Sequence, residues 1–249
     1  MIDKEGLISI ANLRRFNPRN AEKEYFQDLV LHSLYSLAGK KLVFKGGTCL
    51  YKIHKLNRFS EDLDFDAEKG IKLDIIVQKT LYNMRLLGIN CAIKYIDKSE
   101  KGINIGINFN GPLYNGTKQS LCFLLLNIST RRKTVLPPNF AKIASIYNEF
   151  PDFDVFSMDP KEILAEKVAA IHERNKPRDV YDLWFLLNHM KIKLDEKLVK
   201  TKLKKNFNKE VFTKKLLENE KYWEDELERF IIGQLPSFQK ISKEITESI

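Results

Sequence analysis

The spacing of hydrophobic residues changes near residue 157, and this change limits the possible folds more than any other feature of the chain. Before it, segments with helical spacing alternate with short apolar runs typical of strands. After it, nearly every segment has helical spacing. Mixed elements followed by helices alone predict an α/β (α+β) domain over 1–157 and an all-helical domain over 158–249.

The expected elements can be given by residue range. Helices are expected at 20–38, with Asn20 as the cap, at 48–56 and at 72–87. Strands are expected at 41–44, 62–66, 92–96, 103–109 and 121–128, and the segment PDFDVFSMDP, residues 151–160, is expected to be irregular. The later helices are expected at 161–173, 179–190, 195–205, 209–219, 221–232 and 238–248.

Composition excludes several classes of protein. A hydrophobic share of 43% and a charged share of 30% are those of an ordinary globular chain. No apolar run approaches the ~20 residues of a membrane span, and the first residues lack the pattern of a signal peptide. Three scattered cysteines, Cys49, Cys91 and Cys122, form no CxxC pair, which predicts reduced, buried thiols in a cytoplasmic protein.

Positive charge is concentrated in one segment. Ten lysines lie between residues 191 and 215 against three acidic residues, so this segment carries most of the net charge of +9. A concentrated positive surface attracts polyanions, above all nucleic acid. A solvated helical face in a lysine-rich protein is an equally good interpretation.

The stretch from Lys45 to Asp66, KGGTCLYKIHKLNRFSEDLDFD, joins a double glycine to three alternating aspartates. Gly46 and Gly47 lack Cβ atoms, so the chain can turn tightly there and its N–H groups can approach a phosphate. A helix that follows would point its positive end at the same anion. Asp62 and Asp64 on a strand project from one face about 7 Å apart, as a half-site for Mg²⁺ that a triphosphate would complete.

Each feature alone has an ordinary explanation. A double glycine most often marks a turn, and alternating aspartates are commonly the wet face of an edge strand. Their combination resembles the nucleotidyltransferase motif of the AbiEii-like toxins, within the DNA polymerase β-type nucleotidyltransferase superfamily. The matching residues are Lys45, Gly46, Gly47, Thr48, Arg58, Ser60, Asp62 and Asp64.

That resemblance implies a fold and roles for these residues. It implies a mixed sheet flanked by helices, with Asp62 and Asp64 as the catalytic pair that holds the metal. Gly47 and Thr48 would touch the triphosphate, and Lys45, Gly46, Arg58 and Ser60 would belong to the nucleotide site. Asp66 lies outside the family pair, and a place at the strand end fits it better than a ligand role.

A second informative segment runs from Met158 to Trp184. Asp159 followed by Pro160 predicts a helix start. Lys167 and Arg174, seven residues apart, lie at the edge of the apolar stripe, where they could contact a phosphate or extend past apolar surface into water. Glu162, Glu166, Ala169 and Glu173 are expected on the solvated side of this helix.

The same family has a motif that matches this segment. Its pattern is K-E-x-x-x-x-K-x-x-A-x-x-x-R followed by K-P-R-D-x-Y-D-L. The resemblance implies that Lys167, with Lys161 as a weaker candidate, binds the triphosphate and that Arg174 contributes to the same site. Asp179 would be a catalytic acid residue, although it could equally cap the next helix with Asp182 at the third position.

One position departs from the superfamily. Polymerase-type transferases carry a third carboxylate on a later strand, and the polar residue expected there is Asn127, which cannot act as a base. Asp66, Asp179 or solvent would then take that role.

The leading hypothesis for function is an enzyme that transfers a nucleoside monophosphate from an NTP to an acceptor with two Mg²⁺ ions. The resemblance implies a toxin restrained by an antitoxin protein and an RNA acceptor such as tRNA. Two alternatives stay open: a catalytically degenerate module that binds nucleotide or RNA, and a metal-dependent nuclease.

Overall fold

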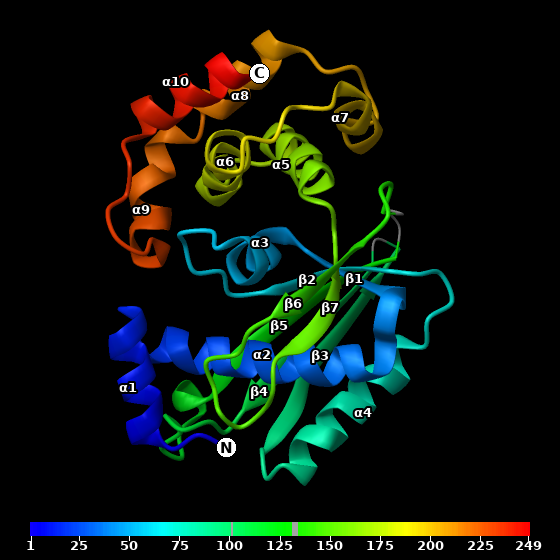
Figure 1. Cartoon of the computed structure of the whole chain (residues 1–249), viewed down its shortest axis with the longest axis vertical. Coiled ribbons are helices and arrows are strands. Elements are labelled where there is room, and N and C mark those ends of the chain that lie inside the picture. The colour runs from blue at the N-terminus through cyan, green and yellow to red at the C-terminus, as the bar shows by residue number, and fades with distance from the viewer. Residues whose placement is uncertain (101, 131–133) are drawn as a thin grey trace. The chain divides into compact units, whose positions relative to one another are not determined.

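The chain folds into two compact units, and unit 2 includes two short segments from the first part of the sequence. The computed structural model describes residues 1–100, 102–130 and 134–249 (Figure 1). Unit 1 comprises residues 1–54, 60–134 and 138–157, and unit 2 comprises residues 55–59, 135–137 and 158–249, less the residues not described. Two short segments of the chain therefore belong to unit 2, and all residues after Ser157 belong to it as well. The two predicted domains, as independently folding parts, stay a prediction.

Unit 1 is built on a seven-stranded sheet with the order β3-β4-β5-β2-β1-β7-β6. Neighbouring strands are antiparallel except for the parallel pairs β1–β7 and β2–β5. The predicted mixed sheet flanked by helices is confirmed. The strands are β1 (Leu42–Lys45), β2 (Leu63–Ala67), β3 (Cys91–Ser99), β4 (Gly102–Phe109), β5 (Cys122–Ser129), β6 (Asn139–Ile143) and β7 (Phe153–Ser157).

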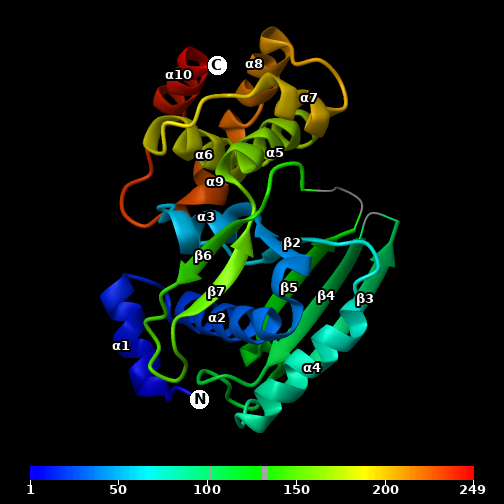
Figure 2. The ribbon, with the colours of Figure 1, turned by 45° about the vertical axis from the view of Figure 1, so that its right-hand side comes forward.

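Helices α2 (Pro18–Ala38) and α4 (Leu73–Leu86) cover one face of this sheet (Figure 2). The alternation along β5 sets this face, because Cys122, Leu124, Leu126 and Ile128 are buried while the residues between them are half-buried. The ring of Phe26 on α2 stacks on Phe109 of β4 at a centroid distance of 4.4 Å. Helix α1 (Lys4–Arg14) packs on α2, and α3 (Gly46–His54) follows β1 directly.

Unit 2 is helical. Helix α5 packs against α6, α7 and α8, and α6 continues into a short π-helix at Phe185–His189. Pro160 occupies the first turn of α5, and Asp159 caps it by accepting a hydrogen bond from the Lys161 N–H, as expected. The helices are α5 (Pro160–Glu173), α6 (Pro177–Trp184), α7 (Glu196–Leu203), α8 (Lys209–Leu217), α9 (Trp223–Leu227) and α10 (Phe238–Ser248).

Several details differ from the sequence-based expectations. Helix α1 and strands β6 and β7 were not expected, and β7 occupies part of the segment that was expected to be irregular. The cap of α2 is Asn17, which accepts from the Arg19 N–H, rather than Asn20. Helix α6 begins at Pro177 with Lys176 as its N-cap, so the interpretation of Asp179 as a cap is wrong.

The expected solvated side of α5 is also wrong at two positions. Glu162 and Ala169 are buried. The Glu162 carboxylate accepts hydrogen bonds from the N–H groups of Val135 and Leu136 and forms an ion pair with Lys202 at 2.5 Å. A segment distant in the sequence, 135–137, therefore covers the side of α5 that its own pattern assigned to water.

Cys49, Cys91 and Cys122 are all buried and unpaired with one another. Among the residues that the structure describes, no helix combines the length and the apolar character that crossing a membrane requires.

Candidate active site

The glycine turn and the aspartate strand meet in unit 1. Strand β1 ends at Lys45, and Gly46 opens α3 with a φ of +75°, which a residue with a side chain rarely adopts. A Cβ atom at Gly46 would lie 2.5 Å from Oδ2 of Asp64. The carboxylate thus rests against the bare backbone of the turn, in the space that any side chain at Gly46 would fill.

The register of the sheet fixes this arrangement. Strand β2 lies between β1 and β5, with Asp64 opposite Lys45 on one side and opposite Asn127 on the other. Asn127 Nδ2 donates a hydrogen bond to Asp64 Oδ1 at 3.0 Å. One carboxylate oxygen is therefore held by the amide and the other lies beside the glycine turn. Burial raises the pKa of the Cys49 thiol, and the charge of Asp64 raises it further, so this cysteine is a neutral neighbour of the carboxylate.

The segment that carries Asp62 is anchored by two helices. The Thr48 hydroxyl of α3 donates to the carbonyl of Asp62, and Gln27 Nε2 of α2 donates to the carbonyls of Ser60 and Glu61 at 2.8 and 2.9 Å. Asp62 lies directly before β2, which begins at Leu63, rather than within the strand. Thr48 is fully buried, so its hydroxyl positions the aspartate segment, and a direct contact between Thr48 and a triphosphate stays a prediction.

Lys45 and Asp66 form an ion pair within unit 1. The distance from Lys45 Nζ to Asp66 Oδ1 is 2.7 Å, and the Asp66 side chain is 3% exposed. Asp66 is the penultimate residue of β2 and is buried, so it lies near the strand end, as expected, but not on a wet face of the sheet. Any contact between Lys45 and a phosphate would have to share the ammonium with this carboxylate.

The second motif forms a compact charge cluster within unit 2. Arg58 donates through Nε and Nη2 to the two carboxylate oxygens of Asp182, both at 2.7 Å. Lys167 Nζ lies 2.6 Å from Asp182 Oδ2 and 2.8 Å from Asp179 Oδ1. Arg174 Nε donates to Asp179 Oδ2 at 2.8 Å. Three cations and two carboxylates thus alternate through one network with a net charge of +1.

Electrostatics keep Asp179 and Lys167 of this cluster ionised. Burial alone would raise the pKa of Asp179, but the charges of Lys167 and Arg174 and their hydrogen bonds outweigh it and hold that pKa well below its ordinary value of 3.8. Burial opposes the charge of Lys167 as well, yet the two aspartates leave its pKa raised. Asp179 is therefore a carboxylate with little tendency to accept a proton.

Arg58 also ties its own segment into unit 2. Besides the pair with Asp182, Nη1 donates to the carbonyl of Phe59 at 3.1 Å. The N–H of Phe59 donates to the carbonyl of Phe230, and the N–H of Ile232 donates to the carbonyl of Asn57. Arg58 is only 2% exposed, so in this structure it has a structural role. A contact between Arg58 and a nucleotide stays a prediction.

The structure sorts the residues expected at the site into two groups. Unit 1 holds Lys45, Gly46, Gly47, Thr48, Ser60, Asp62 and Asp64, and unit 2 holds Arg58, Lys161, Lys167, Arg174 and Asp179. Lys161 is exposed and borders a hollow of about 840 Å³ together with Lys191, Lys193 and Lys197. The sequence interpretation did not assign Asp182 to the site. Its spacing of three residues from Asp179, on one helix face, was the available signal.

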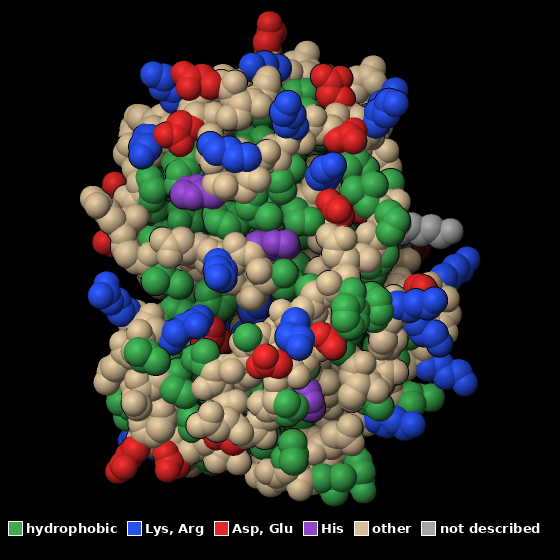
Figure 3. All heavy atoms as spheres, in the orientation of Figure 1, with side chains coloured by type: hydrophobic (Ala, Val, Ile, Leu, Met, Phe, Trp, Pro, Cys, Tyr) green, Lys and Arg blue, Asp and Glu red, His purple; other side chains and the backbone are tan. Residues whose placement is uncertain are grey.

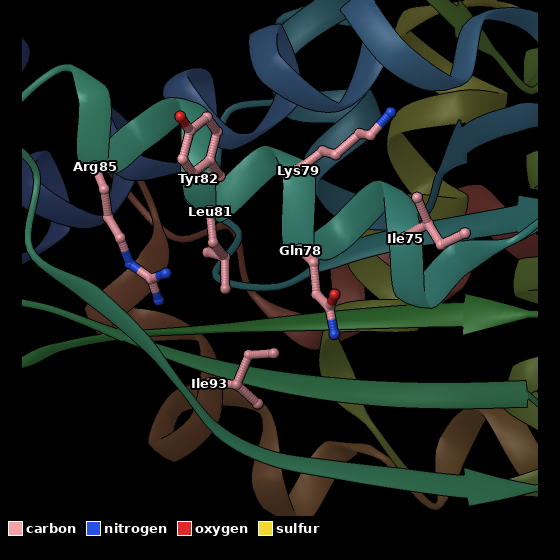
Figure 4. Close-up of a pocket in the computed structure, with 7 residues that line it drawn as sticks. All are labelled: Ile75, Gln78, Lys79, Leu81, Tyr82, Arg85 and Ile93. Atoms are coloured by element: carbon pink, nitrogen blue, oxygen red, sulfur yellow. The ribbon is translucent and has the colours of Figure 1, made fainter.

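Among the described residues, no three His, Cys, Asp or Glu side chains gather as a metal site. Asp62 and Asp64 have carboxylate oxygens, the donor type that Mg²⁺ prefers, and the amide of Asn127 lies beside Asp64. A hollow of about 540 Å³ between α4 and β3 is lined by Ile75, Tyr82, Arg85, Ile93 and their neighbours, and none of the expected site residues borders it (Figure 4).

Comparisons with known proteins bear on this geometry. Residues 30–244 match the family model described as nucleotidyl transferase AbiEii toxin, type IV toxin–antitoxin system. The chain belongs to this family. The resemblance noted in the sequence is confirmed, and the enzyme class is nucleotidyltransferase. No curated protein matches the chain by sequence.

Two solved structures show the same fold at low sequence identity. MenT4, a nucleotidyltransferase toxin from Mycobacterium tuberculosis, aligns with a TM-score of 0.71 and 19% identity over 100% of this chain and 88% of that chain. The protein JHP933 from Helicobacter pylori aligns with a TM-score of 0.57 and 23% identity over 94% of this chain and 91% of that chain.

Proposed function

We propose that this member of the AbiEii family transfers a nucleoside monophosphate from an NTP to an RNA acceptor and releases pyrophosphate. The observation that carries the proposal is the contact between Gly46 and the carboxylate of Asp64. It supports the proposal because a turn that could accept an anion and a carboxylate oxygen that could bind a metal then lie together in unit 1, as the transfer of a nucleotidyl group from a metal-bound triphosphate requires.

The triphosphate would bind at the start of α3. The first N–H groups of a helix have no partner within it, and they carry its partial positive charge. Gly46 is half-exposed and Gly47 is buried, so a phosphate would approach this turn from the side of Gly46. Thr48 would support this turn from within, since it is fully buried and its hydroxyl donates to the carbonyl of Asp62.

Asp62 and Asp64 would hold Mg²⁺, with phosphate oxygens and water completing its coordination. Mg²⁺ bound there would lower the pKa of the acceptor hydroxyl and neutralise the leaving pyrophosphate. Asn127 would orient Asp64 through its hydrogen bond of 3.0 Å, which leaves the oxygen beside Gly46 for the metal. An amide cannot take a proton, so the acceptor proton would pass to another carboxylate of the site or to solvent.

The cluster of unit 2 would contribute charge rather than a base. Asp179 has a lowered pKa, which makes it a poor proton acceptor. Arg174 has a half-exposed side chain, whereas Lys167 is buried against two carboxylates, so Arg174 is the better candidate for a phosphate contact. Lys167 and Asp179 would then fix the position of the arginine, and Lys161 would add a more distant charge.

An RNA acceptor is supported by charge. Of the ten lysines between 191 and 215, eight are exposed, Lys215 is half-exposed, and Lys202 is buried in ion pairs with Glu162 and Glu166. On the face drawn in Figure 3, basic and acidic side chains are interspersed over the helices of unit 2. Such a surface would hold a phosphate backbone without reading bases. tRNA is one RNA of this kind.

The family setting adds a partner and a compartment to the proposal. The enzyme would act as the toxin of a toxin–antitoxin pair, with an antitoxin protein that restrains it. Three cysteines that form no disulfide fit the reducing cytoplasm.

The experiment is a transfer assay with each of the four α-³²P-labelled NTPs, Mg²⁺ and total RNA. We expect label on RNA with the wild-type protein, and a loss of at least about 100-fold in Asp64→Asn. Asp154→Asn is the matched control, because Asp154 is an exposed strand residue of the same unit. NTP binding without transfer would favour a degenerate binding module, and RNA shortening without NTP would favour a nuclease.

A further inference from the structure

A β-bulge in β3 changes the face on which one aromatic side chain lies. Ile93 pairs with Ile107 of β4, and Tyr95 pairs with the adjacent Gly106, so Lys94 is an extra residue in the ladder. Ile93 lies on the side of the sheet that α4 covers (Figure 4). Without the bulge, Tyr95 would share that side, because residues two apart on a strand point the same way. With it, Tyr95 shares the face of Gly106.

Four residues from three strands form a surface on that face. The ring of Tyr95 is stacked against that of Phe123 on β5, with centroids 6.3 Å apart and planes at 30°. Lys94 Nζ lies 4.9 Å from the centroid of the Phe123 ring. A Cβ atom at Gly106 would lie 2.6 Å from Tyr95 Cε1 and 2.9 Å from Phe123 Cε2. Glycine at 106 is therefore what lets both rings lie against the strand backbone.

This aromatic surface is continuous with the candidate active site. Phe123, Leu125 and Asn127 follow one another on the same face of β5, since the residues between them point into the core. Asn127 donates to Asp64, the proposed metal ligand. Four residues at ~3.3 Å each put Phe123 roughly 13 Å from Asn127 along the strand. The order β3-β4-β5-β2 keeps all of these residues on neighbouring strands (Figure 2).

We propose that the surface formed by Lys94, Tyr95, Gly106 and Phe123 stacks an unpaired nucleobase of the RNA acceptor, and so guides the strand toward Asp64. The inference rests on the proposed function and names the part of the acceptor that the site takes. A planar ring that is 41% exposed offers a π-face to any base, and a lysine beside it suits the neighbouring phosphate. Stacking requires a base that is free of a duplex, so the acceptor segment is single-stranded.

The test measures binding without catalysis. A fluorescein-labelled 12-nucleotide oligoadenylate RNA is titrated with the full-length protein in the absence of NTP, and its anisotropy gives Kd. Because loss of a base–aromatic stack weakens binding by roughly 5-fold or more, Tyr95→Ala should raise Kd by about that factor. Tyr95→Phe should bind as the wild type does, since the ring remains. Tyr82→Ala is the matched control, because Tyr82 is an exposed tyrosine of α4 in the same unit.

Each outcome decides for or against the inference. Weaker binding in Tyr95→Ala, retained binding in Tyr95→Phe and Tyr82→Ala, and an unchanged melting temperature support it. Equal Kd values for Tyr95→Ala and wild type overturn it. RNA binding that is retained in a Tyr95→Ala protein that has lost a co-purified protein partner also overturns it. Asp64→Asn separates this inference from the transferase proposal: if it abolishes label transfer while Tyr95→Ala changes neither transfer nor Kd, only the stacking surface is refuted.

Discussion

Alanine at Gly46 should damage the site without unfolding the protein. Two effects can be separated. A φ of +75° costs an L-residue about 1–2 kcal/mol of stability. In addition, the new methyl carbon would lie 2.5 Å from Asp64 Oδ2, about 0.9 Å inside the ordinary contact limit of 3.4 Å, so the carboxylate has to move by nearly that amount. A displacement of about 1 Å at a reacting centre can cost 10²-fold in rate.

Gly88→Ala is the control for the first effect. Gly88 has a φ of +76°, nearly that of Gly46, and a Cβ atom there meets nothing within 4 Å. Both variants should therefore lose about 1–2 kcal/mol of unfolding free energy in urea titrations. Only Gly46→Ala should lose label transfer, by about 100-fold. Equal transfer rates in the two variants would refute the contact between the turn and Asp64 as the basis of the site.

Three further predictions concern other parts of the molecule. Arg58→Met should destabilise unit 2 by about 3 kcal/mol in chemical denaturation, since it leaves the buried Asp182 short of one partner; a variant as stable as the wild type would exclude the structural role. The lowered pKa of Asp179 contributes stability that is present above its ordinary pKa of 3.8 and is lost as the pH falls below it, because the unfolded chain then binds the proton first. The urea midpoints at about pH 5 and pH 3 should therefore differ less in Asp179→Asn than in the wild type. An equal difference in the two proteins would contradict the lowered pKa. Asn127→Asp puts a second carboxylate about 3.0 Å from Asp64 Oδ1. The melting temperature of this variant in EDTA should fall because the two carboxylates repel, and Mg²⁺ should raise it more than it raises that of the wild type. Identical shifts with Mg²⁺ would argue against a metal beside Asp64.

The strand–turn–helix around Gly46 could be predicted from sequence because its signals are local. Alternation gave Leu63 and Phe65 to the core, and both are buried. The pairing of Asp64 with Asn127 was out of reach, since it depends on the parallel register of β2 and β5, which lie about sixty residues apart. Sequence did single out Asn127 as the polar residue on that strand.

Burial by distant segments explains most of the remaining differences. The spacing of α5 predicts that Glu162 is a surface residue, but segment 135–137 and Lys202 pack on it and bury it. Asp66 continues an alternating row, yet Lys45 from the neighbouring strand neutralises it inside the sheet. Strands β6 and β7 are five residues each and carry polar or proline-rich flanks, so their signal is weak without the sheet that they extend.

The most direct test of the central claim is a crystal structure of the protein with Mn²⁺ in place of Mg²⁺ and a non-hydrolysable NTP analogue. The account predicts an anomalous peak about 2.1 Å from a carboxylate oxygen of Asp64, with the phosphates against the backbone of residues 46–48. A peak at any other group of side chains, or a triphosphate seated away from Gly46 and Gly47, would contradict it.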